Sequence, residues 1–306
     1  MAIGCLHGIS AFSSCKKDDD KTTQTNTTIT DVVSANASYS ILKAAVVKAG
    51  LTATLSGTGP FTVFAPADDA FTAAGITMNT VNTLSADQLK SILLYHTLAA
   101  KVTSSNVPAG PNAAVATAGS DSIYVTKNSK GAFVNGVPVV KADIAASNGV
   151  IHSLGSVLMP PAGNIVEVAQ ADTTFSYLVA AVLRASQGTT KVAQVLADAA
   201  GPYTVFSPTN NAFRAAGFAT VAAINSADPN TLASILTYHV ISGRIFSSDL
   251  TDGAQPATLN GGEVTIGLTS GATVKGNTNT SPSKIVAANI VATNGVIHVI
   301  DQVLLP

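Results

Sequence analysis

The eleven residues from Phe61 to Phe71 read FTVFAPADDAF, and a close copy of them, YTVFSPTNNAF, occupies Tyr203 to Phe213. The two copies lie 142 positions apart in the chain. Recurrence of a segment at one offset is the signature of a duplicated structural unit, and the offset can be tested on other segments. The sequence therefore suggests two copies of one domain.

Each copy of this segment reads as a strand followed by a short helix. Its first half is aromatic and β-branched, which favours a buried strand. Pro66 and Pro208 end that strand, because proline has no N–H group to donate to a sheet. Asp68 and Asn210 follow, and we expect each to cap the first turn of the helix that begins beside it.

Three other segments repeat in the same order. Their offsets drift from 136 to 146 positions, a difference that loops of unequal length can absorb. The matched pairs are Ser40-Ile41-Leu42 with Ser176-Tyr177-Leu178, Tyr95-His96 with Tyr238-His239, and Asn148 to His152 with Asn294 to His298. Four matched blocks per copy indicate a duplicated domain.

Capping residues and apolar spacing indicate which helices carry the Tyr-His pairs. The stretch 31–50 is predicted to form one helix with an apolar stripe, and Gly50 is the C′ residue at which that helix stops. Ser85 and Gln88 have the spacing of a capping box, which opens a helix that ends near His96. Asp228 and Pro229 open the corresponding helix of the second copy. In both helices the His falls on the core-facing stripe, so we expect a neutral ring with a hydrogen-bond partner.

The later part of each copy has the character of strands. A tight turn at Asn148-Gly149, with positive φ, is expected to lead into the last strand. The predicted strands of the first copy are 122–126, 132–136, 137–140 and 150–158, and those of the second are 263–266, 272–275 and 285–290.

In their order and spacing, the TVF-x-P block, the Tyr-His pair and the final NGVIHVIDQVLLP block resemble the signatures of tandem fasciclin-type domains, the fasciclin-I class. The resemblance implies an α+β fold of two tandem fasciclin-like domains, each a β-sandwich or wedge flanked by helices. We place the domains at residues 29–161 and 162–306, after a leader of residues 1–28. In some animal members the region of the Tyr-His pair is implicated in cell adhesion, so Tyr95, His96, Tyr238 and His239 are the positions to test.

The composition argues against several classes of function. Charged residues make up 11% of the chain, against roughly 25% in typical soluble proteins, and the net charge is −1. Such a chain has no field that would attract nucleic acid. No apolar run approaches the ~18 residues of a membrane-spanning helix.

The leader resembles a bacterial lipoprotein signal. Small residues precede Cys15, and a charged run, Lys16 to Asp20, follows it, as in the export tags of some surface lipoproteins. On this reading Cys15 carries the lipid and the segment up to Thr28 is a flexible tether. The alternative is a disordered charged tail in which the Cys has no role.

The chain offers few groups for catalysis. His96, His152, His239 and His298 sit at repeat-equivalent positions, and neither a metal-binding motif nor a nucleophile elbow accompanies them. We therefore expect no enzyme, no metal and no cofactor, and structural roles for the histidines. Asp301 follows His298 in the second copy, whereas Gly155 stands at its place in the first.

These observations lead to one functional hypothesis and one alternative. The hypothesis is a non-enzymatic adhesion module that binds a cell-surface or matrix protein or a polysaccharide. It would be held to the membrane through the lipid anchor only, at the surface of the outer membrane or in the periplasm of a bacterium. The alternative is a carrier for an apolar lipid or pigment, which the resemblance and the low charge both allow. A buried hydrogen-bonded strut is the competing interpretation of the Tyr-His pairs.

Overall fold

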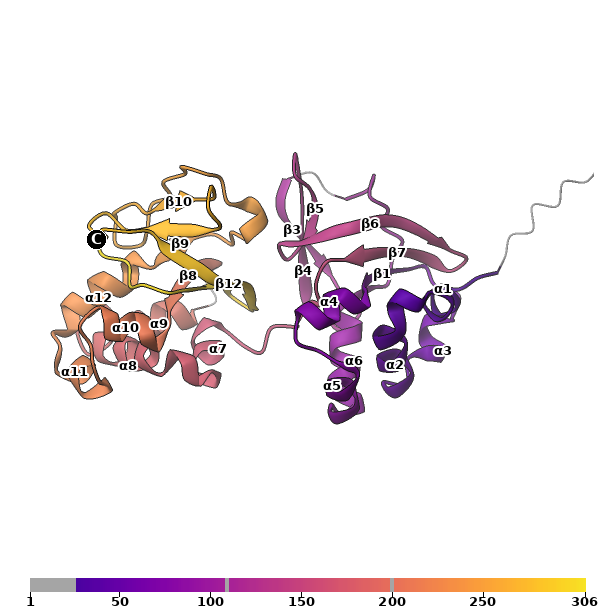
Figure 1. The fold of residues 1–306 in the computed structure, drawn as a ribbon, viewed down its shortest axis with the longest axis horizontal. Helices are drawn as coiled ribbons and strands as arrows, with labels where there is room; N and C mark the ends of the chain where they lie inside the picture. Colours follow the sequence, from indigo (N-terminus) through magenta and orange to yellow (C-terminus); the bar gives the residue numbers. More distant parts are fainter. Residues whose placement is uncertain (1–25, 108–109, 199–200) are drawn as a thin grey trace, which may run out of the picture.

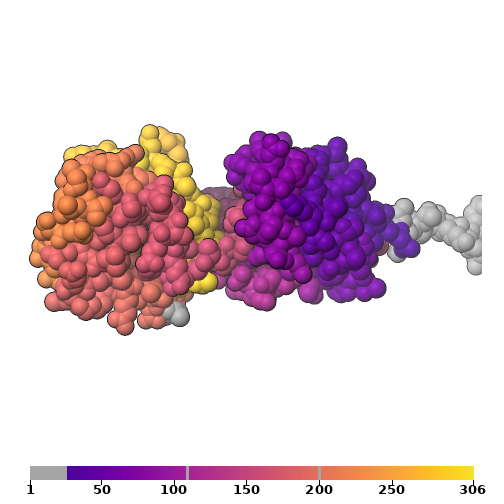
Figure 2. Space-filling model, turned by 90° about the horizontal axis from the view of Figure 1, so that it is seen from below, coloured from indigo at the N-terminus to yellow at the C-terminus, as the bar shows by residue number. Residues whose placement is uncertain are grey.

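The computed structural model describes residues 26–107, 110–198 and 201–306, which form two domains of the same design (Figure 1). In each domain the helices gather on one side, below the strands in the figure. The space-filling view shows two lobes with an indentation between them (Figure 2). Cys15 and the rest of the proposed lipoprotein signal lie outside the described residues.

The first domain opens with helices and closes with strands. Its helical elements are α1 (Ile29–Ala35), the 3-10 helix η1 (Ala37–Tyr39), α2 (Ser40–Lys48), α3 (Thr52–Leu55), α4 (Asp68–Ala73), α5 (Met78–Thr83) and α6 (Ala86–Tyr95). Its strands are β1 (Phe61–Pro66), β2 (Thr97–Leu98), β3 (Gly110–Ala116), β4 (Ser122–Asn128), β5 (Gly131–Val134), β6 (Val137–Ala146) and β7 (Gly149–Leu154). They form one curled sheet in the order β2-β1-β7-β6-β5-β4-β3.

The second domain repeats this design with shorter outer strands. Its helical elements are α7 (Ile165–Ala171), η2 (Thr173–Phe175), α8 (Ser176–Ala185), α9 (Val192–Ala197), α10 (Asn210–Ala215), α11 (Val221–Ser226), α12 (Pro229–Tyr238) and η3 (Ser247–Asp249). Its strands are β8 (Tyr203–Pro208), β9 (Val240–Ser242), β10 (Thr265–Gly267), β11 (Thr273–Lys275), β12 (Ser283–Ala292) and β13 (Gly295–Ile300), in the order β10-β11-β12-β13-β8-β9.

The strand of the quoted segment lies second from one edge of each sheet, between a short edge strand and the last strand of its domain. β1 pairs in parallel with β7, and β8 pairs in parallel with β13. Both strands of each pair are almost entirely buried, as expected for parallel strands covered on both faces. The predicted strands β1 and β8 and the predicted α+β class of two repeated domains are confirmed. Strand β7 ends at Leu154, before the predicted end at residue 158.

The turn before the last strand differs from the prediction. Neither Asn148 nor Gly149 has a positive φ. The glycine is needed for space instead, because a Cβ atom on Gly149 would lie 2.1 Å from the Phe61 carbonyl oxygen. Gly295 approaches the Tyr203 carbonyl in the same way. These glycines let the two parallel strands of each domain approach each other closely.

The first predicted helix is broken in two. Asn36 has an extended backbone, with φ −97° and ψ 117°, and its side chain accepts a hydrogen bond from the Ser38 N–H. This local bond competes with helical geometry, so α1 ends and a new helical segment starts. Gly50, with φ +69°, follows the end of α2, as predicted. The capping box of Ser85 with Gln88 and the Asp228 cap before Pro229 are also confirmed.

The prediction that Asp68 and Asn210 cap their own helices is wrong. The Asp68 carboxylate accepts hydrogen bonds from the Ser40 and Ile41 N–H groups, at the N-terminus of α2. Asn210 likewise accepts a bond from the Tyr177 N–H, at the start of α8. Each side chain therefore caps a neighbouring helix and fixes that helix to the segment that follows β1 or β8.

Candidate functional site

The Tyr-His pairs are buried in both domains. Tyr95 and His96 end helix α6, Tyr238 and His239 end helix α12, and none of the four side chains is more than 2% exposed. The apolar stripe of each helix faces the central sheet and carries the His with it. All four side chains are therefore almost completely shielded from solvent.

Each His of the pairs joins its own helix to the segment that follows the last strand. His96 Nδ1 lies 2.8 Å from the Ile92 carbonyl oxygen, and the Leu158 N–H donates to His96 Nε2 over 2.9 Å. His239 makes the same two contacts, with the Ile235 carbonyl and the Leu304 N–H, at 2.8 Å each. A nitrogen beside a carbonyl must donate and one beside an N–H must accept. Both rings are therefore neutral, with the proton on Nδ1.

Burial sets the protonation of these groups. It lowers the pKa of His96 and of His239 to about 4, because a charged imidazolium loses its hydration there. Burial also raises the pKa of Tyr95 to about 12. Both histidines are thus uncharged, and Tyr95 keeps its hydroxyl proton, at any neutral pH.

The Tyr hydroxyls tie the helices to the outer strands. Tyr95 Oη donates to the Ser122 carbonyl oxygen over 3.2 Å and accepts from Asn135 Nδ2 over 2.9 Å. Tyr238 Oη donates to the Glu263 carbonyl oxygen and accepts from the Asn277 N–H. The bonds that the two hydroxyls donate are repeat-equivalent, and we infer that each Tyr-His pair is a structural support.

His152 and His298 hold a bulge in the neighbouring strand. Nε2 of each ring faces a carbonyl oxygen, of Val102 at 2.8 Å and of Ile245 at 2.9 Å. Nδ1 of each accepts from a backbone N–H across the bulge, at 3.2 Å for His152 and 3.4 Å for His298. Burial lowers the pKa of His298. All four rings thus have both nitrogens engaged, which leaves none for a metal or a substrate.

The carboxylate that occurs only in the second domain has a local partner. Asp301 Oδ1 accepts from the Lys284 N–H over 2.7 Å and from Ser283 Oγ over 3.1 Å. These bonds hold the start of β12 against the end of β13. In the first domain Gly155 stands at this place, and a Cβ there would lie 3.1 Å from Pro138.

Replacing Asp301 by alanine is expected to lower the free energy of unfolding of the second domain by about 1–2 kcal/mol, because hydrogen bonds to a charged acceptor are lost. Urea denaturation measures this loss, and hydrogen exchange shows which of the two domains unfolds. Asp301→Asn keeps an acceptor oxygen and should lose less. Equal stability of wild type, Asp301→Ala and Asp301→Asn would contradict this role.

Two negative findings apply to residues 26–107, 110–198 and 201–306. No group of three or more His, Cys, Asp or Glu side chains in these ranges could hold a metal ion. No helix in them is long and apolar enough to cross a bilayer.

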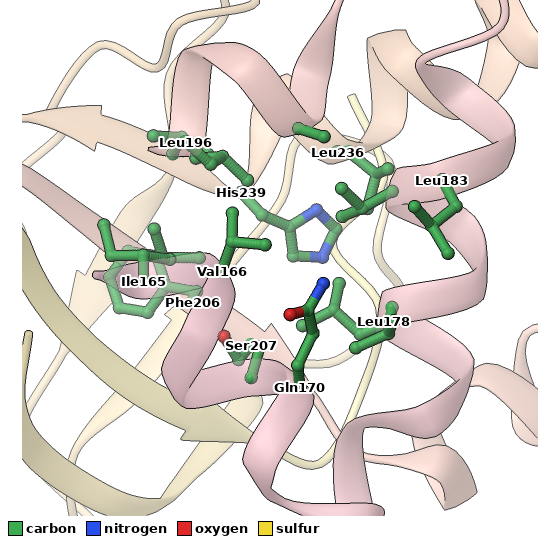
Figure 3. A pocket seen from close by; sticks show the side chains of 16 residues that line it. Ile165, Val166, Gln170, Leu178, Leu183, Leu196, Phe206, Ser207, Leu236 and His239 are labelled. Carbon is green, nitrogen blue, oxygen red and sulfur yellow. The ribbon is translucent and has the colours of Figure 1, made fainter. Parts of the chain in front are cut away.

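An apolar pocket opens beside His239 (Figure 3). Helices α7, α8, α9 and α12 and strand β8 line it, and its volume is about 70 Å³. Figure 3 shows the His239 ring and the Gln170 amide pointing into the same cavity, with Leu183 at its edge. Because both ring nitrogens are already bonded, His239 offers the pocket only the surface of its ring.

The first domain has the corresponding pocket beside His96. Its volume is about 50 Å³, and it lies between α1, α2, α3 and β1. Val47 stands at its edge where Leu183 stands in the second domain, and these side chains are 62% and 55% exposed. The sequence analysis did not identify either residue. The available signal was an apolar residue just outside the buried stripe at equivalent positions in both copies.

A larger cleft lies between the domains. Its volume is about 580 Å³, and its walls come from the β5–β6 turn, the segment 156–162, Val168 and strand β12. The walls are mostly apolar, and no charged side chain is among them. Met159, 53% exposed, lies at this cleft.

Comparisons with known proteins match both domains. The family model described as "Fasciclin domain" matches residues 37–160 and 174–306. "Protein sll1483" of Synechocystis is 42% identical over 138 residues, which cover 44% of this chain and 74% of that protein. "Transforming growth factor-beta-induced protein ig-h3" of Sus scrofa is 29% identical over 258 residues, which cover 82% of this chain and 35% of that protein.

A third relative is "Cell surface glycolipoprotein MPB83" of Mycobacterium bovis, 37% identical over 106 residues, which cover 35% of this chain and 44% of that protein. This chain thus spans about a third of ig-h3 and less than half of MPB83. The family match extends over most of the chain and falls once on each domain. The chain belongs to the fasciclin domain family, of which it carries two copies in tandem.

Proposed function

We propose that this protein is a non-enzymatic adhesion module of the bacterial cell envelope, which contacts its partner through the pocket on the helical side of each domain. One observation carries the proposal: Val47 and Leu183 expose large apolar side chains at equivalent positions, each beside an apolar pocket. An exposed apolar side chain lowers the solubility of a protein, although a single one on a surface is ordinary and needs no explanation. The recurrence of this feature in both copies favours a shared use.

The size of the pockets limits what they can take. Ligand sites for small molecules usually enclose roughly 300–1,000 Å³. Cavities of about 70 and 50 Å³ are much smaller, and each suits a single apolar side chain. Burial of an apolar anchor in such a pocket is typical of binding hot spots in protein interfaces. A partner protein with exposed aliphatic or aromatic residues fits these pockets better than a polysaccharide does.

The comparisons support the location. MPB83, a relative of about one domain of this chain, is named a cell surface glycolipoprotein. We place the anchor at Cys15, with residues 1–28 as signal and tether before domains at 29–161 and 162–306. Mass spectrometry of protein taken from its native membrane tests this anchor, since an acylated Cys15 is expected and an unmodified Cys15 would refute it.

Adding charge beside the pockets should weaken adhesion. We expect the double variant Val47→Glu, Leu183→Glu to bind whole cells or isolated envelope proteins at least about tenfold more weakly, because a carboxylate would be desolvated where an apolar anchor enters. Binding of the purified full chain to immobilised cells, envelope proteins and envelope polysaccharides measures the effect.

The matched control is Asn225→Glu, which adds the same charge at an exposed position of α11, away from the pockets. It should bind as the wild type does, and circular dichroism should show that all variants fold. Absence of wild-type binding to every surface would contradict adhesion. Unchanged binding of the double variant would show that adhesion uses another surface.

The cleft between the domains favours the second candidate, a carrier of an apolar lipid or pigment. Its volume of about 580 Å³ lies within the usual range of ligand sites, and its walls carry no charge. We expect Ala288→Trp, which would fill this cleft, to abolish co-purification of any such molecule. Organic extraction of protein from its native source followed by mass spectrometry decides the point. Extracts without a stoichiometric apolar molecule would contradict the carrier role.

A further inference from the structure

The two domains touch through a small set of matched groups. In the second domain these belong to the segment from Arg244 to Leu250, which includes η3. In the first they belong to strands β3 and β4 and the turn after β4. Asn112 Nδ2 donates to the Arg244 carbonyl oxygen, and Lys130 Nζ donates to the Leu250 carbonyl oxygen over 2.9 Å. Asn128 adds a third bond, to the Ser248 carbonyl oxygen.

Arg244 is the centre of this contact. It is 8% exposed, and its guanidinium donates to the carbonyl oxygens of Ala292, Thr293 and Gly295, at the turn before β13. The guanidinium carbon lies 4.2 Å from the centroid of the Tyr124 ring, which belongs to the first domain. The attraction between a cation and the face of an aromatic ring is strongest where water is excluded. Tyr124 thus covers the face of Arg244 that its own domain leaves open.

Phe246 extends the aromatic contact. It is fully buried, and its ring centroid lies 6.0 Å from that of Tyr124. Nearby, the Gly136 turn approaches the Asn289 side chain so closely that a Cβ on Gly136 would lie 2.6 Å from Asn289 Nδ2. An aromatic pair, a cation on a ring and a close turn leave little freedom for one domain to rotate against the other.

The repeat shows which of these groups are particular to the junction. Thr62 bonds to the Ala100 carbonyl and the Val102 N–H, as Thr204 bonds to the Gly243 carbonyl and the Ile245 N–H. In this register Lys101 is the counterpart of Arg244, and Thr103 is that of Phe246. Lys101 is exposed, whereas Arg244 is buried.

The first-domain side of the contact also uses a residue type that its repeat counterpart lacks. Tyr95 bonds to the Ser122 carbonyl and Tyr238 bonds to the Glu263 carbonyl, so the register places Thr265 at the counterpart of Tyr124. The outward-facing copies of both surfaces thus lack the Arg and the two aromatic rings. The groups that make the contact occur only where the two domains meet.

We propose that the surface of Arg244 and Phe246 is a docking site for the face of the first domain around Tyr124, and that this docking makes the two domains one rigid body. The partner of this surface is therefore the neighbouring domain of the same chain. Because the outward-facing copies lack these groups, the same contact does not propagate to further copies of the chain. The docking also fixes the width of the cleft between the domains.

Distances between spin labels test this docking in the full chain. Labels at Ala73→Cys in α4 and Ala171→Cys in α7, both exposed, report on the two domains once Cys5 and Cys15 are replaced by serine. We expect a single narrow distance distribution for the otherwise wild-type chain. Tyr124→Ala should broaden it at least about twofold, because domains without a firm interface move by default.

Two controls separate docking from folding. Tyr124→Phe keeps the ring and should keep the narrow distribution, and so should Lys101→Ala, which removes the counterpart of Arg244. Arg244→Ala should also broaden the distribution, but it removes bonds within its own domain, so Tyr124→Ala carries the test. A broad distribution in the wild type, or equal broadening by Lys101→Ala, would overturn the proposal.

Discussion

Replacing Asn294 by alanine is expected to lower the free energy of unfolding of the second domain by about 3–5 kcal/mol. The side chain is 7% exposed and joins three parts of the domain. Its Oδ1 accepts from the Ile165 N–H, at the start of α7, over 2.9 Å. Its Nδ2 donates to the carbonyl oxygens of Leu196 and Asp198, at the end of α9, over 2.8 and 3.0 Å.

The size of this effect follows from what alanine would leave behind. The Ile165 N–H and the Leu196 carbonyl oxygen would lose a buried partner, and each buried polar group left unpaired costs about 1–3 kcal/mol. Whole domains are stable by roughly 5–15 kcal/mol, so the second domain would be close to unfolding. Hydrogen exchange resolved by domain measures the loss.

The repeat offers a matched experiment. Asn148 makes the equivalent bonds in the first domain, with the Ile29 N–H and with the carbonyl oxygens of Leu55 and Gly57. Asn148→Ala should therefore destabilise the first domain by a similar amount and leave the second unchanged. Exposed Asn225→Ala should change neither domain. A loss below about 1 kcal/mol for both buried variants would show that these bonds do not support the fold.

Acid is expected to destabilise both domains between pH 6.5 and pH 4. The pKa of His96 and His239 is about 4 in the folded protein, against 6.5 for an ordinary His. The unfolded chain therefore binds a proton at higher pH than the folded chain does. The stability that each buried neutral His contributes is present above pH 6.5 and is lost as the pH falls toward 4, by about 3 kcal/mol per His.

The second domain contains a further buried His that titrates in the same direction. Burial lowers the pKa of His298 as well, so this His adds a loss of the same sign. The pKa of Asp31, Asp143 and Asp228 lies below the ordinary 3.8, and the contribution of these carboxylates is lost only at lower pH. Their titration is thus separate from that of the histidines.

Denaturant unfolding at several pH values, resolved by domain, measures the acid effect. His239→Gln cannot titrate, so it should start less stable but lose about 3 kcal/mol less than the wild type between pH 6.5 and 4. Its first domain should respond to acid as before. A wild-type stability that stays constant over this interval would contradict the buried neutral state of the histidines.

The sequence was informative where a structure depends on neighbouring residues. The Ser85 capping box and the Asp228 cap involve positions within a single turn, and both were predicted correctly. The repeat located β1, β8 and the Tyr-His helices, because similar segments of a duplicated domain adopt the same structure. The burial of the histidines also followed from their place on the apolar stripe of each helix.

Features that join distant segments could not be predicted in this way. Asp68 caps a helix that starts 28 positions earlier, and no local pattern distinguishes this from a cap of its own helix. Strand β3 was missed because its residues, GPNAAVA, are mostly small and lack the aromatic and β-branched residues of a typical strand. Arg244 and Tyr124 lie 120 positions apart, and only the folded chain brings them together.

The pockets were missed for a related reason. Val47 and Leu183 look in the sequence like ordinary members of apolar helices, and their exposure becomes evident only when the helices are packed. The comparison of equivalent positions then separates two groups of residues. Val47 and Leu183 are equivalent apolar residues, and each borders a pocket in its own domain. Arg244 and Phe246 differ in kind from their counterparts, Lys101 and Thr103, and belong to the domain junction.

The protonation of the Tyr-His histidines, followed by nitrogen-15 NMR from pH 7.5 down to pH 4, tests most directly whether these residues are internal supports. For His96 and His239 we expect neutral rings with the proton on Nδ1, and no titration until the pH approaches 4. Rings that titrate near pH 6.5, or that carry the proton on Nε2, would contradict the account and would return these histidines to the list of candidate contact residues.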